Sequence, residues 1–499
     1  STPIKSSAAS DVYKRQVNVA MENLPADNLK YYDLGSGLVT NTIGSSMIKW
    51  NMASFMGRIN YNYLGRYLLT VSARYDGSSR LADGHKWVLF PSAALAWRIN
   101  EESFMSSTSG WLDNLKLRLG FGKTGNSAVD PYQTKGTLSL IRYPFDNGGT
   151  PTIGYAPNAM ANSLLTWETT DQWNLGIDFG VLRGRINGTI DLYMQNTHDL
   201  LLKRQLPVVS GFPDVLSNVG KTRNKGIEVS INSMNINSKD FQWTTDLMLS
   251  SNKEEIVELY NGKNDDIGSK WFIGQPVNVH YDYRKVGIWQ NTESDLAEMA
   301  KFAANGTEFA PGDIKIQDVN GDYKITDADK QILGNPRPKL IASMVNTFNY
   351  KGFDLSVFLY ASFGAMLYND IYALEHCGRN GGVKVDYWTP NNPTNAYPRP
   401  SIDEERPIYI TSTYYEKADF LRVKTMTLGY TLPKTLTNKF LVEKLRVYFT
   451  AQNPFIFTNY TGIDPEAAKV NSAGNPETNG SGFGTPSVSS WIFGINLTL

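Results

Sequence analysis

An acidic segment has the residue types and the spacing that calcium binding requires. EF-hand-type loops place oxygen donors at positions 1, 3, 5 and 12 and a backbone carbonyl at position 7. The matching residues are Asp318, Asn320, Asp322, Asp329 and the carbonyl of Lys324, with the hydroxyl of Thr326 beside them. Tyr323 replaces the usual glycine and Asp329 the usual Glu, so we expect weakened binding of calcium or a related cation. Such a site would brace a loop rather than catalyse; an acidic loop without metal is the alternative.

A set of aromatic residues in expected loops could contact a substrate, because aromatic faces stack on sugar rings and on apolar side chains. These residues are Trp271, Phe272, Trp289, Tyr387 and Trp388. The alternative is that the same rings pack between loops or against a second protein. Both interpretations place these rings outside the regular strands.

The remaining chemically active side chains form no recognisable constellation. The histidines His85, His198, His280 and His376 are scattered without metal-ligand spacing. Cys377 follows His376, but nothing nearby supplies the third member of a nucleophilic triad. The glycine-rich run 120–125 lacks the spacing of a phosphate loop. The sequence therefore predicts a protein that is not an enzyme.

The bulk composition restricts the class of protein. The 499 residues carry a formal net charge of +0, which argues against nucleic-acid binding because that requires a basic surface. Aromatic residues make up 12% and there are 42 glycines, a composition typical of many strands and turns. One cysteine allows no internal disulfide. No apolar run of about 18 residues occurs, so no transmembrane helix is expected.

Strict alternation of apolar and polar residues is the main signal for the elements that position these residues. Leu69, Val71 and Ala73 share one face, for example, and Thr70 and Ser72 occupy the other. The pattern recurs in the segments 58–63, 67–76, 93–100, 115–122, 172–179, 185–195, 227–232, 353–359, 445–451 and 491–499. Within 421–430 the apolar face changes phase, which predicts a β-bulge near Thr425. We expect roughly fifteen strands of about 9–12 residues, the length of tilted membrane strands.

The links between the expected strands alternate between short and long. Gly65 and Arg66 predict a tight turn, whereas the stretches 76–90, 196–223 and 360–419 are long. Lipid cannot hydrogen-bond a free backbone, so a membrane sheet must close, with its apolar face toward lipid and its polar face toward water. Aromatic residues at strand ends fit the girdles at the membrane surfaces: Tyr63, Tyr67, Tyr75, Trp97 and Tyr193. The sequence therefore predicts an all-β fold, part of a transmembrane antiparallel β-barrel, with a soluble β-sandwich as the alternative.

Several segments, taken in order, resemble the SusC-like TonB-dependent outer-membrane transporters of Bacteroidetes, the RagA/SusC family. The resemblance covers residues 17–499 and is carried by a series of stretches along the chain. They are NYNYLGRYLLTVSARYDGSS (60–79), FPSAALAWRINEESF (90–104), LDNLKLRLGFGKTGN (112–126), WETTDQWNLGIDF (167–179), NVGKTRNKGIEVSI (218–231), DVNGDYKITDADKQILGNPRP (318–338) and FLRVKTMTLGYTLP (420–433).

The resemblance implies a barrel of about 22 strands that encloses an N-terminal plug, in the outer membrane of a Gram-negative bacterium. It also implies import of oligosaccharides or peptides, coupling to the TonB complex and a SusD-like surface lipoprotein as partner. We expect 17–499 to be the C-terminal portion of the barrel, without the plug and the TonB box. Residues 1–16 show no strand pattern and are expected to be unrelated or disordered. A passive porin-like or adhesin-like barrel and a secreted carbohydrate-active β-protein are the alternative functions.

Overall fold

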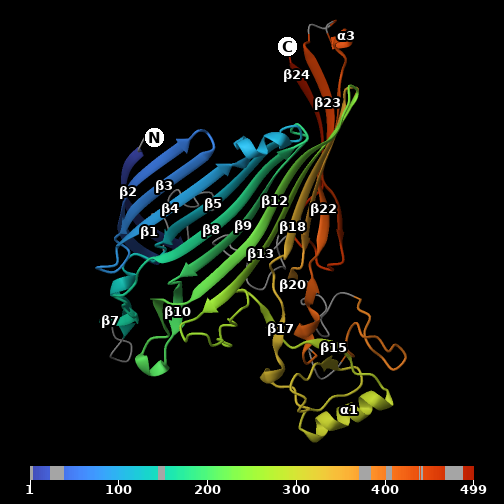
Figure 1. The fold of residues 1–499 in the computed structure, drawn as a ribbon. Helices are drawn as coiled ribbons and strands as arrows, with labels where there is room; N and C mark the ends of the chain where they lie inside the picture. The colour runs from blue at the N-terminus through green and yellow to red at the C-terminus, as the bar shows by residue number, and fades with distance from the viewer. Residues whose placement is uncertain are drawn as a thin grey trace.

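A single antiparallel sheet of 14 strands dominates the computed structural model, and its strands are neighbours in chain order (Figure 1). The structure describes residues 4–22, 39–143, 152–369, 384–400, 407–437, 439, 442–466 and 487–498, with 4–22 and 39–46 as backbone only. The strands of the sheet are β1 (Ile4–Glu22), β2 (Val39–Tyr63), β3 (Tyr67–Ser78), β4 (Trp87–Arg98), β5 (Leu112–Asn126), β8 (Glu168–Val181), β9 (Ile186–His198), β12 (Lys221–Asn237), β13 (Phe241–Glu258), β18 (Leu340–Tyr350), β19 (Phe353–Phe363), β22 (Phe420–Thr431), β23 (Lys444–Thr458) and β24 (Ser490–Thr498).

Shorter elements lie in the connections between these strands. Two-stranded ribbons pair β6 (Thr137–Tyr143) with β7 (Thr152–Ala159), β10 (Leu201–Gln205) with β11 (Asp214–Asn218), β14 (His280–Asp282) with β17 (Gln331–Gly334), β15 (Lys285–Ile288) with β16 (Ile314–Ile316), and β20 (Met366–Tyr368) with β21 (Tyr415–Lys417). The helices are α1 (Glu293–Ala304) and α3 (Lys434–Thr437), and the 3-10 turns are η2 (Ile99–Glu101), η3 (Ser103–Thr108), η4 (Gln133–Lys135), η5 (Val208–Ser210), η6 (Asp327–Asp329) and η8 (Ile410–Thr413).

The two faces of the sheet differ in polarity as the alternation predicts. On one face the apolar side chains stay accessible, with Leu69, Ile177 and Phe493 exposed at 39%, 38% and 80%. The other face carries ion pairs such as Arg118 with Asp178, at 2.8 Å. A soluble sandwich would bury the apolar row, so the predicted membrane barrel wall is confirmed.

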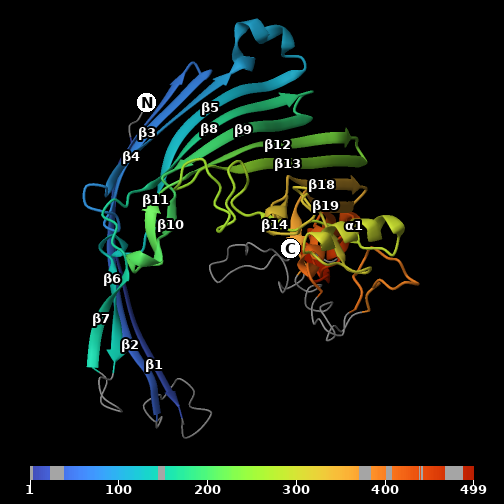
Figure 2. The ribbon, with the colours of Figure 1, turned by 90° about the horizontal axis from the view of Figure 1, so that it is seen from below.

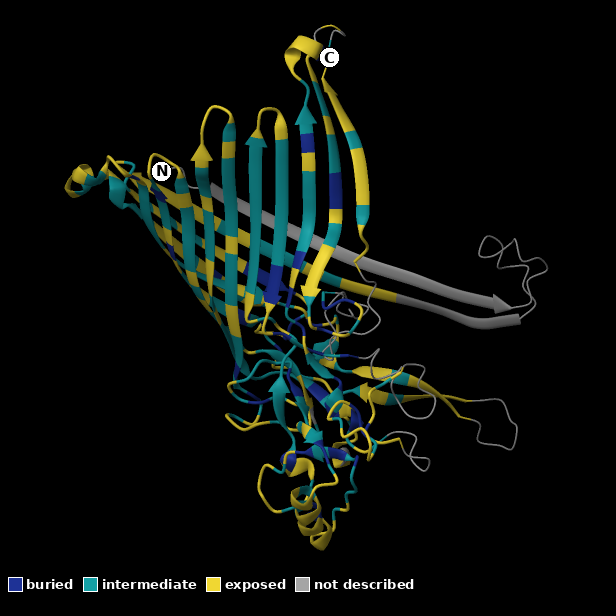
Figure 3. Ribbon diagram, turned by 90° about the vertical axis from the view of Figure 1, so that its right-hand side faces the viewer, coloured by how far each residue is buried: buried dark blue, intermediate teal, exposed yellow. Residues whose placement is uncertain are grey.

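The sheet curves about one axis, so that its strands form part of a cylinder wall (Figure 2). Within the described part of the chain, β1 and β24 are the two edges, each paired to a single neighbour. Connections at one end of the wall are short and those at the other end are long (Figure 1). Gly65 and Arg66 form the tight turn that the sequence predicts, with Arg66 N donating to Tyr63 O at 3.1 Å. Figure 3 shows buried residues gathered toward the long-loop end.

Aromatic residues line both ends of the apolar face. At the short-turn end, Tyr67 stacks on Trp97 with ring centroids 6.4 Å apart. Both residues donate to one carboxylate oxygen of Glu102, at 2.7 Å from the Tyr67 hydroxyl and 3.0 Å from the Trp97 indole nitrogen. Rings that are apolar on one side and hydrogen-bonded at the tip suit a membrane surface.

Tyr193 was expected among these aromatics, and its register corrects that expectation. It pairs with Gly226, and its hydroxyl oxygen would lie 2.6 Å from a Cβ at that glycine. The residue therefore lies on the polar face, opposite to its neighbours Leu192 and Met194, because successive residues of a strand alternate between faces.

The predicted bulge is confirmed in β22. On the β19 side the register changes between Val423 and Thr425, which leaves Lys424 as the extra residue. On the β23 side the register also shifts there, but Asn453 and Pro454 face the single residue Lys424, so the extra residue belongs to β23. Arg422 and Lys424 both bind Glu466, so the slip brings two cations to one carboxylate. The bulge explains why the apolar face changes phase in this strand.

Other expectations from the sequence need correction. Eight of the 14 strands are longer than the expected 9–12 residues, up to 25 residues in β2, and the other six fall within that range. The stretch 76–90, expected as a long link, is nearly half strand, because β3 continues to Ser78 and β4 begins at Trp87, which leaves 79–86 as the link. Residues 4–16 lie in β1, paired with β2, where no strand was expected. Whether 1–16 is a segment separate from the barrel stays a prediction.

Candidate functional site

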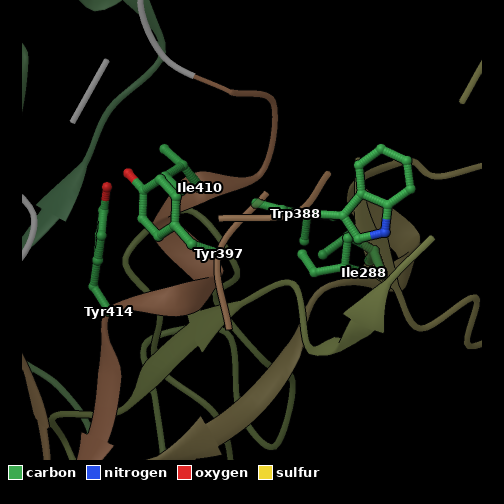
Figure 4. Packing of buried hydrophobic residues seen from close by; sticks show 7 residues of the cluster. Ile288, Trp388, Tyr397, Ile410 and Tyr414 are labelled. Carbon is green, nitrogen blue, oxygen red and sulfur yellow. The ribbon is translucent and has the colours of Figure 1, made fainter. Parts of the chain in front are cut away.

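Two long connections at one end of the wall fold together into a loop module, which comprises residues 259–339 and the described residues of 364–419. Their shared core takes Ile288, Ile314 and Ile316 from the first connection and Trp388, Tyr397, Ile410 and Tyr414 from the second (Figure 4). Each of these residues is buried. Because the core takes buried residues from both connections, the two connections form one packed unit.

Polar contacts join the same two connections. Arg399 donates through Nε to Asp313 Oδ1 at 2.8 Å, and its backbone nitrogen donates to Gly312 O at 2.8 Å. The Trp388 indole donates to Gln290 Oε1 at 2.9 Å. Lys285 Nζ donates to the carbonyl of Ala396 at 2.8 Å, and burial lowers the pKa of this lysine to about 8. These contacts fix the relative position of the two connections.

The helix α1 closes a second apolar cluster within the module. Trp289 is fully buried against Met299 and Phe302 of the helix. The Nζ of Lys315 lies 4.0 Å from the centre of the Trp289 ring and pairs with Asp295 at 3.1 Å. A ring enclosed in this way supports the helix and offers no face to a ligand.

Buried polar residues hold the module near the rim of the sheet. His280 Nε2 lies 2.7 Å from the carbonyl of Met366, and burial lowers the pKa of this histidine. The Tyr415 hydroxyl donates to Asp282 Oδ2 at 3.0 Å, and burial raises the pKa of that hydroxyl. These residues link β14 to β20 and β21, so they connect the two halves of the module where it joins the strands.

The predicted substrate-contact residues separate into two groups. Phe272, Trp289 and Trp388 are buried, at 8%, 0% and 6% exposure. Tyr387 is 45% exposed and Trp271 is half-buried. Burial of Phe272, Trp289 and Trp388 supports the alternative in which these rings pack between loops. Substrate binding stays a proposal, and Tyr387 and Trp271 are the two rings best placed for it.

A cleft between the two connections was not anticipated from the sequence. It has a volume of about 280 Å³ and is lined by Glu308, Phe309, Asp313, Pro398, Arg399 and Tyr409. The aromatic rings of Phe309 and Tyr409 lie 6.4 Å apart at their centres. Two aromatic rings beside a paired Arg and Asp offer both stacking and hydrogen bonding. The lining residues come from two segments that are about 90 positions apart in the sequence, so only the fold brings them together.

The acidic loop is folded around its own backbone. Asp318 accepts hydrogen bonds from Gly321 N at 2.7 Å and from Tyr323 N at 2.8 Å. Asp329 is fully buried and accepts from Val319 N at 2.9 Å and Thr326 N at 2.8 Å. Its two oxygens therefore close the loop.

The remaining predicted donors of this loop also bind its backbone. Asn320 accepts from Asp322 N at 3.1 Å, and Asp322 accepts from Lys324 N at 2.8 Å. Among the described residues, no three His, Cys, Asp or Glu side chains are grouped so that they could hold a metal ion. The calcium site, with its amide and carbonyl donors, stays a prediction.

The other histidines have separate surroundings. His198 Nε2 lies 3.5 Å from Asp171, and His85 is exposed in the loop after β3. His376 and Cys377 lie outside the described residues. No helix within the described ranges is long and apolar enough to cross a membrane.

Comparison with known proteins assigns this wall and its loop module to a family. A family model described as TonB dependent receptor-like, beta-barrel matches residues 20–453. The chain belongs to the TonB-dependent receptor family. As a member of it, this receptor chain lies in the outer membrane, as the sequence predicts.

Individual relatives support the SusC-like relationship. The receptor chain is 33% identical over 490 residues to TonB-dependent receptor P3 of Formosa agariphila, covering 94% of this chain and 48% of that protein. It is 35% identical over 434 residues to SusC of Bacteroides thetaiotaomicron, covering 83% of this chain and 41% of that protein. The chain thus spans about half the length of the curated relatives it matches.

Solved structures share the fold of this receptor chain. The RagAB peptide importer in its open-open state superposes with a TM-score of 0.81 at 23% identity, covering 100% of this chain and 52% of that one. The structure of the RagAB peptide transporter gives a TM-score of 0.78 at 22% identity, covering 99% and 56%. In outer-membrane barrels the longer loops are extracellular, which places the loop module of the receptor on the cell surface.

Proposed function

We propose that the protein to which this wall belongs imports a nutrient, an oligosaccharide or a peptide, across the outer membrane. The observation that carries the proposal is a TonB-dependent receptor wall whose extracellular end bears a folded loop module. Relatives include SusC and a RagAB peptide importer, so both substrate classes remain in the proposal. The protein acts as a transporter and not as an enzyme.

Energy coupling and a partner belong to the same proposal. Because the chain belongs to the TonB-dependent receptor family, import takes its energy from the TonB complex. A SusD-like lipoprotein covers the extracellular mouth. The exposed rim of the loop module, including Tyr387 at 45% exposure, offers the surface on which substrate and lipoprotein would meet. A calcium ion bound in the 318–329 loop would stiffen this surface.

Uptake measurements test the proposal directly. Cells with and without the gene are given fluorescent oligosaccharides and fluorescent peptides, in the presence and absence of a functional TonB complex. We expect gene-dependent uptake of one substrate class that stops when TonB is inactivated. Uptake that persists without TonB would favour the passive porin-like alternative. Equal uptake in cells that lack the gene would refute import of these substrates.

A further inference from the structure

We propose that basic residues on the short turns between β8 and β23 bind the anionic headgroups of phospholipids in the periplasmic leaflet of the outer membrane. In outer-membrane barrels the short turns face the periplasm, opposite the extracellular loops. The residues lie in four links between strands at that end of the wall (Figure 1). The links are 182–185, 238–240, 351–352 and 432–443, and together they are called the basic turn row.

The basic turn row carries an excess of positive charge. Its basic residues are Arg183, Arg185, Lys239, Lys351, Lys434 and Lys439, and its acidic residues are Asp240 and Glu443. The carboxylate of Asp113 on β5 lies beside the first link and accepts from Gly184 N at 2.7 Å. Within the described part of the chain, none of the six cations forms an ion pair with a carboxylate. Cations therefore outnumber carboxylates in the row even when Asp113 is included.

Two of these cations have partners that carry no charge, so the positive charge is retained. The guanidinium of Arg185 donates to the backbone carbonyl of Asn235 at 2.9 Å. Lys351 Nζ lies 5.4 Å from the centre of the Tyr350 ring, which is 50% exposed. An aromatic face attracts an ammonium group without neutralising it. The Tyr350 contact thus keeps one cation beside an exposed ring at the edge of the wall.

Backbone hydrogen bonds connect the links along the wall. These bonds run from Met234 N to Arg185 O at 2.7 Å, from Lys351 N to Asp240 O at 3.3 Å and from Thr431 N to Gly352 O at 2.8 Å. Consecutive links are two strands apart, a distance of about 10 Å. This distance is close to the screening length at physiological ionic strength, so the potentials of neighbouring links add.

Lipid-facing aromatic residues border the basic turn row. Trp243 on β13 stacks on Phe348 on β18, with ring centroids 5.6 Å apart. The ring of Phe353 on β19 lies 4.5 Å from that of Tyr430 on β22. Strand pairing places these four rings on the apolar face of the wall, in the same alternation phase as Leu355. Aromatic residues at the end of an apolar barrel face lie at the level of the headgroups.

The cations lie just beyond these rings. Lys351 follows Phe348 by three residues, about 10 Å along the chain and less along the membrane normal because membrane strands tilt. A phosphate of the periplasmic leaflet would thus meet the row while its acyl chains contact the apolar strand faces. A soluble periplasmic protein would gain the charge but not the apolar contact, so the surface favours a lipid.

The neighbouring part of the short-turn end, between β2 and β5, has no such excess of charge. Arg66 pairs with Glu102 at 3.3 Å, and Arg98 pairs with Glu101 at 3.1 Å. Cations and carboxylates neutralise each other in these two pairs. Anionic lipid is therefore expected along one part of the wall and not evenly around it.

Lipid binding to the intact receptor tests this proposal. The protein that carries this chain is purified from outer membranes and placed in nanodiscs of equal parts phosphatidylglycerol and phosphatidylethanolamine. Native mass spectrometry counts how many of each lipid the released protein retains. The test variant is Arg183→Gln/Lys239→Gln/Lys351→Gln, which removes one cation from each of three consecutive links. The matched control is Lys263→Gln/Lys270→Gln/Lys384→Gln, which removes the same charge from exposed lysines of the loop module.

We expect the unmodified protein to retain phosphatidylglycerol in preference, and this preference to fall by about fivefold per cation removed in the test variant. The control should keep the preference. Equal retention of both lipids by the unmodified protein, or an equal loss in the control, would overturn the proposal. An unchanged preference in the test variant would overturn it too, and a simultaneous loss of binding to the periplasmic domain of TonB would assign the row to a protein partner.

Thermal unfolding of each variant, measured in parallel, separates lipid binding from folding. Lys239→Gln alone, at an exposed turn position, repeats the comparison with the smallest change to the wall. We expect about a fivefold loss of preference with an unchanged unfolding temperature.

Discussion

The guanidinium of Arg446 on β23 reaches the carboxylate of Asp354 on β19 across β22, which lies between the two strands, with 2.9 Å between Nε and Oδ1. Gly429 of β22 leaves the space for this pair. A Cβ at that position would lie 2.4 Å from an Arg446 nitrogen and 2.6 Å from an Asp354 oxygen. On the polar face of the wall, this ion pair therefore joins β19 to β23 by passing over a glycine of β22.

The same arrangement occurs between β5, β8 and β9. Arg118 on β5 reaches Asp191 on β9 at 2.9 Å, and a Cβ at Gly176 of β8 would lie 2.5 Å from the guanidinium carbon. Each bridge joins two strands across the one strand between them, on the water-facing side. They resist separation of the strands without any contribution from side chains in lipid.

Replacing either glycine tests the bridges. Gly429→Ala or Gly176→Ala should push the ion pair apart and lower the free energy of unfolding by about 1 kcal/mol. Gly120→Ala is the matched control, because its Cβ would meet only Asn174 at an ordinary 3.9 Å. Urea unfolding in lipid vesicles measures the difference. An equal effect of Gly120→Ala would show that the bridges contribute nothing specific.

A charge placed on either face of β3 tests the orientation of the wall. Val71→Arg should lower the free energy of unfolding by about 2–4 kcal/mol, because arginine at mid-membrane is unfavourable. Ser72→Arg, one residue along, should be tolerated since that side chain faces water. The folded fraction in outer membranes, read from heat-dependent gel mobility, gives the result. Comparable loss in both variants would contradict the assignment of faces.

Arg74→Ala would be a poor control for the water-facing side of β3. Arg74 Nε donates to Asp76 Oδ2 at 2.7 Å, and Asp76 is fully buried. Removal of Arg74 would leave a buried carboxylate without its cation, which destabilises a fold independently of the membrane. Ser72 has only a 2.6 Å contact with the Ser92 hydroxyl to lose.

Aromatic residues of the loop module should differ in what they support. Trp289→Ala should destabilise the module by about 3–5 kcal/mol, because it empties a fully buried site. Tyr387→Ala removes an exposed ring and should leave stability unchanged while it weakens substrate uptake. Hydrogen exchange of the module, measured beside uptake, separates the two effects. Normal exchange protection in Trp289→Ala would contradict the packing role.

Asp329 and Asp318 should respond differently to calcium. Asp329→Ala removes two acceptors from a buried position and should destabilise the loop by about 1–3 kcal/mol with or without calcium. Asp318→Asn keeps an acceptor and should chiefly weaken calcium affinity, if the ion binds there. Calorimetric calcium titration of both variants and the unmodified protein provides the measurement. Absence of calcium binding by the unmodified protein would leave the loop a purely structural turn.

Lowering the pH should decrease the stability of the loop module around His280, where the module joins the strands. Burial holds the pKa of His280 below its ordinary value of 6.5, so the unfolded chain binds a proton more readily than the folded one. The stability that neutral His280 supports is therefore present above pH 6.5 and decreases as the pH falls below it. Hydrogen exchange at pH 7.5 and 5.5 should show faster exchange near β14 at the lower pH. His280→Gln should remove that pH dependence, and an unaltered dependence would assign it elsewhere.

The wall could be predicted from the sequence because the alternation of apolar and polar residues indicates directly which side chains face lipid. The phase change at Lys424 even located the bulge, since a slip of one residue moves every later side chain to the other face. Strand ends were harder to place. Asp76 and Phe90 look like loop residues, yet extension of β3 and β4 above the membrane buries both.

The loop module could not be predicted in the same way. Its core joins Ile288 to Trp388, residues that no periodicity relates to each other. Buried aromatics and substrate-binding aromatics have the same residue types, so composition cannot distinguish Trp289 from Tyr387.

The shared core of the loop module has a consequence for evolution and engineering. Three of its residues come from one connection and four from the other, so a chimera that receives a single connection from a relative inherits an unmatched half. Changes of cargo preference should therefore spread between receptors through paired exchange of 259–339 with 364–419. Grafting experiments that move both segments together are the ones expected to yield folded, selective hybrids.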